Sequence, residues 1–231
     1  DVDLSSFIGS SADVIQSALP DSSGNIWFAT KFGVVGVVNR APAENQPLVQ
    51  VTKMTGTVLN PLAGQDGQPA VLNEAIGNSF AMDQSGGVYI VSTQALYRYQ
   101  SVGGTPTVTW RTTYDNTNMV KPGQKTPGSG TTPTVIPRNR VAIMDNSDPE
   151  NIVVYDNATG AQVCKVPVFN KGASANENSL ISVGNSLIAE NNYGFANAVT
   201  DADKVVGGMA RVDVASNGTC TPKWTNTSVV V

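Results

Sequence analysis

Histidine is absent from all 231 residues of the chain. Its absence removes the usual general base, the Ser-His and Cys-His catalytic pairs, and every imidazole metal ligand. Charged residues make up only 14% of the chain, and no apolar run reaches the ~18–20 residues that a membrane-spanning helix needs. The net charge of −4, with no run of Lys or Arg, argues against nucleic acid as a partner. The sequence therefore predicts no histidine-dependent hydrolase, no nucleic-acid binding and no membrane span.

The residues that are abundant favour short strands joined by turns. The chain has 22 glycines and 13 prolines, and it is rich in Val, Thr, Ser and Asn, as extracellular β proteins are. It begins at Asp1 without a Met and ends at Val231 inside an expected strand, so we expect a processed or cut chain. We expect the protein to be secreted, extracellular or part of the cell envelope.

A hairpin pattern occurs twice in the first half of the chain. Asp21-Ser-Ser-Gly-Asn-Ile-Trp is matched by Asp83-Gln-Ser-Gly-Gly-Val-Tyr. Each copy is a polar turn followed by a short apolar strand, which is the signature of a β-hairpin. Weaker copies begin at Pro133 and Asn178. Four units are therefore readable, and each contains four strand-like segments.

Repeated four-stranded units predict an all-β fold, a β-propeller with four-stranded antiparallel blades. We expect one propeller domain over residues 1–231, or part of one, with almost no helix. The clearest long connection, residues 116–132, is either a lid or an ordered surface excursion. The expected blades cover residues 13–60, 74–115, 130–170 and 176–227.

The two cysteines, Cys164 and Cys220, leave two alternatives open. Two cysteines in a secreted chain usually form a disulfide. Both, however, occupy the same place in successive units, and equivalent outer positions of neighbouring blades fan apart. A disulfide needs Cα atoms within about 7 Å. The sequence does not decide between a disulfide and two free thiols.

Polar residues open the first strand of each unit, and in a propeller the first strands line the central channel. Acidic residues lie just upstream in three units: Asp13, Glu74 and Glu177. Such a ring of oxygen ligands suits Ca²⁺, which takes six to eight of them. It equally suits a polar ligand, or ordered water alone. The predicted ligand-binding ring consists of Gln16, Asn78, Thr134 and Asn178.

Two further patterns have both a functional and a structural interpretation. The acidic, amide-rich segments 145–151 and 190–194 follow equivalent strands and form either a site or simple Asx turns. Trp27 and Tyr89 occupy equivalent positions in second strands, and Trp110 and Trp224 lie in outer strands. For all four aromatic residues we expect core packing.

With the units aligned, the chain resembles the propeller superfamily that includes quinoprotein-like (PQQ-like) and gluconolactonase-like proteins. The two Asp-x-Ser-Gly hairpins and the Tyr155-Asp-Asn-Ala-Thr-Gly160 turn carry this resemblance, which covers about half the chain. The Trp-docking repeat and vicinal cysteine pair of quinoprotein dehydrogenases are missing. Gluconolactonase-like members hold an axial divalent cation, which implies Glu177, Asn178 and Asn78 as first ligands, with Glu74 completing the predicted metal set. Such propellers have roughly six to eight blades, so blades are expected to be missing here.

These observations lead to three functional expectations. The first is a secreted binding or scaffold propeller that takes a small ligand or ion in its polar channel. The alternative is a Ca²⁺-dependent hydrolase of the lactonase or esterase type, in which the cation polarises a carbonyl group. In the third, another chain or the missing blades complete the ring by pairing with an open strand edge.

Overall fold

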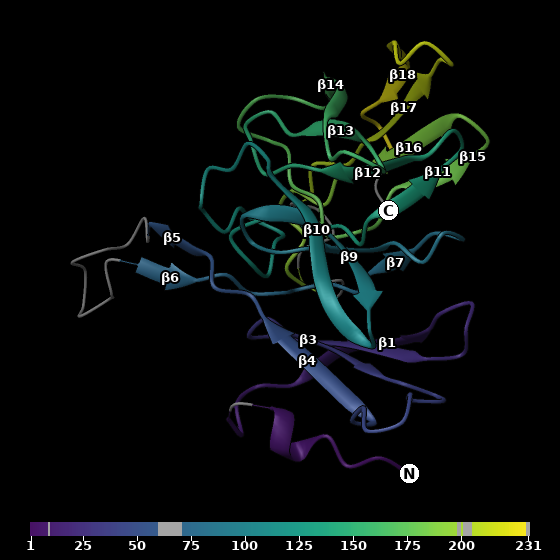
Figure 1. The fold of residues 1–231 in the computed structure, drawn as a ribbon. Coiled ribbons are helices and arrows are strands. Elements are labelled where there is room, and N and C mark those ends of the chain that lie inside the picture. Colours follow the sequence, from purple (N-terminus) through teal and green to yellow (C-terminus); the bar gives the residue numbers. More distant parts are fainter. Residues whose placement is uncertain (9, 60–70, 198–199, 201–204, 230–231) are drawn as a thin grey trace. The chain divides into compact units, whose positions relative to one another are not determined.

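The computed structural model describes residues 1–8, 10–59, 71–197, 200 and 205–229. In this part of the chain the only helical element is the short 3-10 turn η1 (Ser5–Phe7). Four sheets of four antiparallel strands follow one another, and neighbouring strands in each sheet are consecutive in sequence (Figure 1). The all-β prediction with four-stranded blades is confirmed. No helix in the described residues is long and apolar enough to span a membrane.

We call the four sheets blades 1 to 4. Blade 1 contains β1 (Ile15–Pro20), β2 (Ile26–Thr30), β3 (Val34–Val38) and β4 (Val49–Lys53). Blade 2 contains β7 (Ala81–Met82), β8 (Val88–Val91), β9 (Ala95–Val102) and β10 (Thr105–Thr113). Blade 3 contains β11 (Thr134–Ile136), β12 (Arg140–Met144), β13 (Asn151–Asp156) and β14 (Gln162–Pro167). Blade 4 contains β15 (Ile181–Val183), β16 (Ser186–Glu190), β17 (Met209–Val214) and β18 (Cys220–Asn226). A separate hairpin, β5 (Thr57–Leu59) with β6 (Val71–Asn73), lies between blades 1 and 2 in the sequence.

The chain divides into two compact units, Asp1–Arg111 with blades 1 and 2, and Thr112–Val231 with blades 3 and 4. In the first unit, side chains that alternate along β2 and β3 pack against those of β8 and β9 in one buried cluster. Trp27, with 1% of its surface exposed, belongs to this cluster, and Tyr89 is fully buried. Core packing is therefore confirmed for both aromatic residues of the repeated hairpin.

The N-terminal segment covers the other face of blade 1. Phe28 points to that face and packs with Val34 and Val49, against which Leu4 and Phe7 of the N-terminal segment also lie. The ring of Phe28 crosses β3 directly over Gly36, where an added Cβ would be 2.1 Å from the ring. Only glycine leaves room for this close approach of ring and strand.

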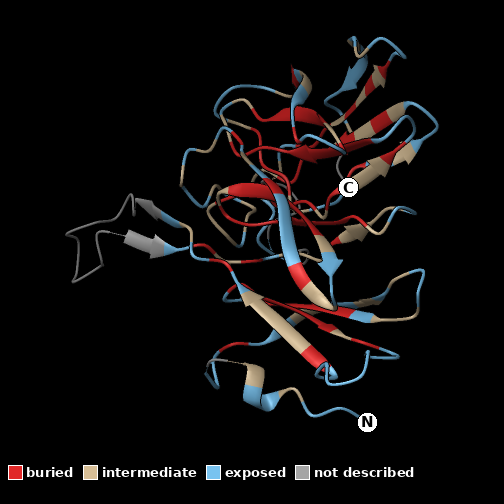
Figure 2. Cartoon of the chain, viewed as in Figure 1, coloured by how far each residue is buried: buried red, intermediate tan, exposed pale blue. Residues whose placement is uncertain are grey.

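In the second unit, blades 3 and 4 share one apolar cluster that includes Met144, Ile152, Leu187 and Val212. Figure 2 shows buried residues both in the sheets and in parts of the connections. Residues 128–131 and 174–176 are two such buried parts. Trp110 in β10 is also buried, but Trp224 has 43% of its surface exposed. The packing prediction is wrong for Trp224, because every residue of β18 after Cys220 is exposed.

Cys164 and Cys220 form a disulfide with their Cα atoms 6.0 Å apart. It joins β14 of blade 3 to β18 of blade 4, which are neighbours within the second unit. Both half-buried side chains pack against the apolar cluster that the two blades share. The expected divergence of equivalent outer strands is therefore too small to separate this pair.

Replacing both cysteines with serine is expected to lower the free energy of unfolding, because the disulfide closes a loop over a sequence separation of 56. Loops of this length give about 2–5 kcal/mol through restriction of the unfolded chain. Denaturant unfolding of C164S/C220S and of wild type, each with and without reductant, measures the effect. If reductant destabilises the double variant as much as wild type, the disulfide is not the source of the difference.

Candidate functional site

The repeated hairpin turn has a structural role in both copies. Asp21 accepts hydrogen bonds from the backbone of Ser23 and Asn25 and from the Trp27 indole, the last at 3.1 Å. Asp83 accepts the equivalent backbone bonds, and the Tyr89 hydroxyl donates to it at 2.5 Å. Each aspartate therefore closes its turn and anchors the aromatic residue of the following strand.

The predicted ring residues divide between the units, with Gln16 and Asn78 in the first and Thr134 and Asn178 in the second. In the first unit the Ser17 and Ser79 hydroxyls, each next to a predicted residue, are 2.7 Å apart. In the second unit the Thr134 hydroxyl donates to the Leu180 carbonyl at 3.0 Å. Within each unit neighbouring first strands are thus bridged by hydroxyl groups. A common site for all four residues stays a prediction.

Glu74, from the predicted metal set, is 2% exposed and surrounded by donors of its own unit. Its carboxylate accepts from the Ser92 hydroxyl at 3.0 Å, from Arg111 Nη2 at 2.7 Å and from the Tyr97 hydroxyl. Burial, followed by the hydrogen bond to Glu74, raises the pKa of Tyr97 to about 12. Glu74 therefore holds the start of blade 2 to three of its strands. No sequence pattern indicated that Tyr97 and Arg111 would be its partners.

Asp13 has the equivalent role in blade 1. Its carboxylate accepts from the Thr30 hydroxyl at 2.9 Å and from the backbone N–H of Phe32 at 2.8 Å, and it is 6% exposed. Thr30 ends β2 just as Ser92 follows β8. In the first unit, the acid upstream of each first strand therefore fixes the end of the second strand.

In the second unit, two patterns that the sequence presented separately come together. Glu190 Oε1 accepts from the side-chain amides of Asn178 at 2.8 Å and Asn192 at 2.7 Å. Asn192 Oδ1 in turn accepts from the backbone N–H of Glu177 at 2.9 Å. Glu177 Oε1 accepts from the backbone N–H of Lys125 at 2.9 Å. We call Glu177, Asn178, Glu190 and Asn192 the Glu190 cluster.

The other acidic turn, residues 145–151, is an Asx-type cap. Asp145 is fully buried and accepts from the backbone N–H groups of Ser147 and Asn151 and from the Asn151 amide. Burial raises the pKa of Asp145, against the opposing effect of these hydrogen bonds. The structural interpretation of this turn is confirmed.

The long connection 116–132 is anchored by a buried ion pair. Lys121 Nζ lies 3.1 Å from Glu150 Oε1, and Gln124 Nε2 donates to the same oxygen at 3.2 Å. Glu150 is fully buried, and its Oε2 has no hydrogen-bond partner in the described structure. Gly123 passes so close to Asn192 that an added Cβ would be 2.1 Å from the Asn192 carbonyl oxygen. The connection therefore packs directly beside the Glu190 cluster.

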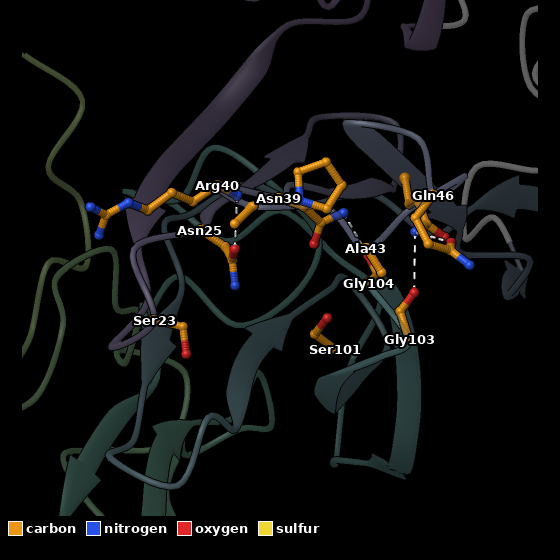
Figure 3. Close-up of a pocket in the computed structure, with 12 residues that line it drawn as sticks. Ser23, Asn25, Asn39, Arg40, Ala43, Gln46, Ser101, Gly103 and Gly104 are labelled. Carbon is orange, nitrogen blue, oxygen red and sulfur yellow. Dashed lines mark hydrogen bonds between the residues drawn. The ribbon is translucent and has the colours of Figure 1, made fainter.

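The first unit also contains an open polar cavity of about 480 Å³ between blades 1 and 2 (Figure 3). It lies at the hairpin turns, where Asn25 and Arg40 of blade 1 face Ser101 and Gly104 of blade 2. No sequence pattern indicated this cavity, because its lining consists of ordinary polar and small residues from both blades. Among the described residues, no group of three or more Cys, Asp or Glu side chains is placed to hold a metal ion.

Comparison with known proteins supports the propeller fold. No protein-family model matches the chain. BamB from Moraxella catarrhalis superposes with a TM-score of 0.55 at 14% identity, covering 92% of this chain and 53% of BamB. A quinohemoprotein alcohol dehydrogenase from Comamonas testosteroni gives a TM-score of 0.45 at 12% identity, covering 78% of this chain and 34% of the dehydrogenase. The superposition on BamB confirms the propeller fold and nothing finer.

One relative is similar in sequence. An uncharacterized protein of Archaeoglobus fulgidus is 34% identical over 113 residues, which cover 49% of this chain and 19% of the relative. The chain thus spans about half the length of BamB, and its 113 matched residues cover about a fifth of the archaeal protein.

The buried Glu150 makes stability depend on pH. Burial raises its pKa from 4.5 to about 7, against the opposing effect of Lys121. A carboxyl group with a raised folded-state pKa stabilises the fold below its unfolded pKa, and this contribution is lost as pH rises through about 7. We expect the unfolding free energy of wild type minus that of E150Q to fall by on the order of 2–3 kcal/mol between pH 4.5 and pH 8.

Denaturant unfolding across this pH range measures the difference. Glu44→Gln removes the same charge at an exposed position and serves as the matched control. A constant difference between wild type and E150Q across the range would contradict the assignment.

Proposed function

We propose that this chain belongs to a β-propeller binding protein that takes a small ligand or ion at the Glu190 cluster. The observation that carries the proposal is a set of acceptor oxygens left open by the hydrogen bonds described above. Glu177 Oε2, Asn178 Oδ1 and Glu190 Oε2 accept no hydrogen bond from the described residues. Asn178 is exposed, so these oxygens are open to a ligand from solvent.

The chemistry of these oxygens favours a hard cation. Two carboxylates and one amide carbonyl are oxygen ligands of the kind Ca²⁺ prefers. Three protein oxygens are fewer than the six to eight that Ca²⁺ takes, so water or a bound ligand would supply the rest. This arrangement fits an exchangeable site at which the ion helps to bind a polar molecule.

The burial and hydrogen bonding of the other carboxylates favour a binding role over a catalytic one. Asp13, Glu74 and Asp145 are all buried and hydrogen-bonded to donors of their own blades. Their role is to hold strands together, whereas Glu177 and Glu190 each keep one carboxylate oxygen that accepts no hydrogen bond from the described residues. The Ca²⁺-dependent lactonase or esterase alternative requires the same ion and, in addition, a carboxylate that transfers a proton.

We propose a secreted or cell-envelope location. The Cys164–Cys220 disulfide supports this location, because disulfides persist in oxidising compartments and are rare in the cytosol.

A Ca²⁺ titration followed by thermal melting tests the ion site. At a Ca²⁺ concentration about tenfold above Kd, we expect about 1.4 kcal/mol of stabilisation and a rise in Tm of roughly 3–6 °C. Glu190→Gln should abolish the rise in Tm, because it removes the negative charge of the carboxylate. The amides of Asn178 and Asn192 donate to Oε1 of this carboxylate and leave Oε2 open. Glu44→Gln is the control for the loss of one charge and should keep the rise.

An unchanged Tm at millimolar Ca²⁺, or an equal rise in E190Q, would overturn the ion site. Lactone and ester hydrolysis, measured with and without Ca²⁺, then separates the two functions. Turnover that depends on both Ca²⁺ and Glu190 would favour the hydrolase over the binding protein.

A further inference from the structure

The polar cavity of the first unit has a lining with a clear chemical preference. Side-chain amides come from Asn25, Asn39, Gln46 and Gln50, and hydroxyl groups from two serines. Arg40 is the one charged side chain among the described lining residues, none of which is aromatic. The volume of about 480 Å³ lies in the range of small-molecule sites. Ala41, Pro42 and Ala43 add apolar surface beside these groups. Amides and hydroxyls recognise hydroxyl groups, so this lining fits a ligand that carries hydroxyl groups on a carbon frame.

The amide groups on one side of the cavity are fixed in place. Asn39, only 6% exposed, donates through Nδ2 to the Gly104 carbonyl at 3.3 Å. Gln50 Nε2 donates to the Gly103 carbonyl and to Gln46 Oε1, both at 3.3 Å. The turn of the β9–β10 hairpin therefore lies between two amide side chains of blade 1.

The glycines of this turn are required by its geometry. Gly103 and Gly104 have φ values of 59° and 85°, which other residues rarely adopt. A Cβ on Gly104 would be 2.7 Å from Gln50 Nε2. The close approach of the two blades at this point holds the side-chain amides of Asn39 and Gln50 in position before any ligand arrives. We call these two amides the amide wall.

Arg40 lies at the opposite end from Gln46 (Figure 3). Its backbone N–H donates to Asn25 Oδ1 at 3.0 Å. Its side chain lies across Gly24, where a Cβ would be 3.0 Å from Arg40 Cδ and from Nη1. Within the described part of the chain the guanidinium makes no ion pair. In a protein of net charge −4, the cavity thus has an exposed guanidinium without an ion pair at the end away from Gln46.

We propose that this cavity binds a small hydroxylated carboxylate, such as a sugar acid, with Arg40 on the carboxylate and the amides on the hydroxyl groups. The planar guanidinium matches a carboxylate with two parallel hydrogen bonds. The amide wall distinguishes a hydroxylated ligand from a simple anion. The site is separate from the Glu190 cluster, which lies in the second unit, and it does not depend on the function proposed there.

Glucuronate is the probe, and its binding to the whole chain is measured by NMR titration and calorimetry. We expect saturable binding with amide shifts at Gly24, Gly103 and Gly104. Glucose, which lacks the carboxylate, and acetate, which lacks the hydroxyl groups, should each bind at least about tenfold more weakly. A comparable affinity of acetate would indicate anion binding alone and overturn the ligand class.

Arg40→Gln should weaken glucuronate binding by about tenfold or more while leaving glucose binding unchanged. Arg138→Gln removes an exposed arginine of the second unit and should leave both affinities unchanged. Equal glucuronate affinity in R40Q and wild type, or no binding by wild type up to roughly 10 mM, would overturn the proposal. Thermal melting of R40Q checks its fold, and Ser101→Ala, which removes a hydroxyl group from the lining, provides a second variant that should weaken glucose and glucuronate alike.

Discussion

Each blade of the first unit begins with a buried acid that reaches across to the end of the second strand. Asp13 does this for blade 1 through the Thr30 hydroxyl, and Glu74 does it for blade 2 through the Ser92 hydroxyl. A buried carboxylate is costly unless donors surround it, and here the donors come from the blade itself. The start of the sheet and the end of its second strand are therefore fixed together.

The few charged side chains of this protein have mainly structural roles. Low charge and no histidine mean that few groups are available for chemistry, and most carboxylates with low exposure serve as hydrogen-bond centres for strands and turns. The exceptions are then informative. Open acceptor oxygens at the Glu190 cluster and the unpaired guanidinium of Arg40 are polar groups for which the described fold has no structural use.

The fold could be predicted from the sequence because its signals are local. A turn of Asp-x-Ser-Gly followed by an apolar strand specifies a hairpin in any context, and its repetition specifies blades. The partners of Glu74 could not be predicted, since Tyr97 and Arg111 lie on later strands and reach it only through the strand register. The Glu190 cluster was predicted as two separate halves, because the bond from Asn178 to Glu190 depends on how β15 pairs with β16. The polar cavity of the first unit could not be predicted either, since it exists only where blades 1 and 2 meet.

The Cys164–Cys220 disulfide lies between outer strands, far along each blade from its first strand. A covalent link at the rim means that blades 3 and 4 cannot separate at their outer edges. The first strands, β11 and β15, have no such link: the Thr134–Leu180 hydrogen bond and the packing of Ile136 and Leu180 in the shared apolar cluster hold them together. The second unit is thus joined covalently at its periphery and by non-covalent contacts alone at the end where Asn178 lies.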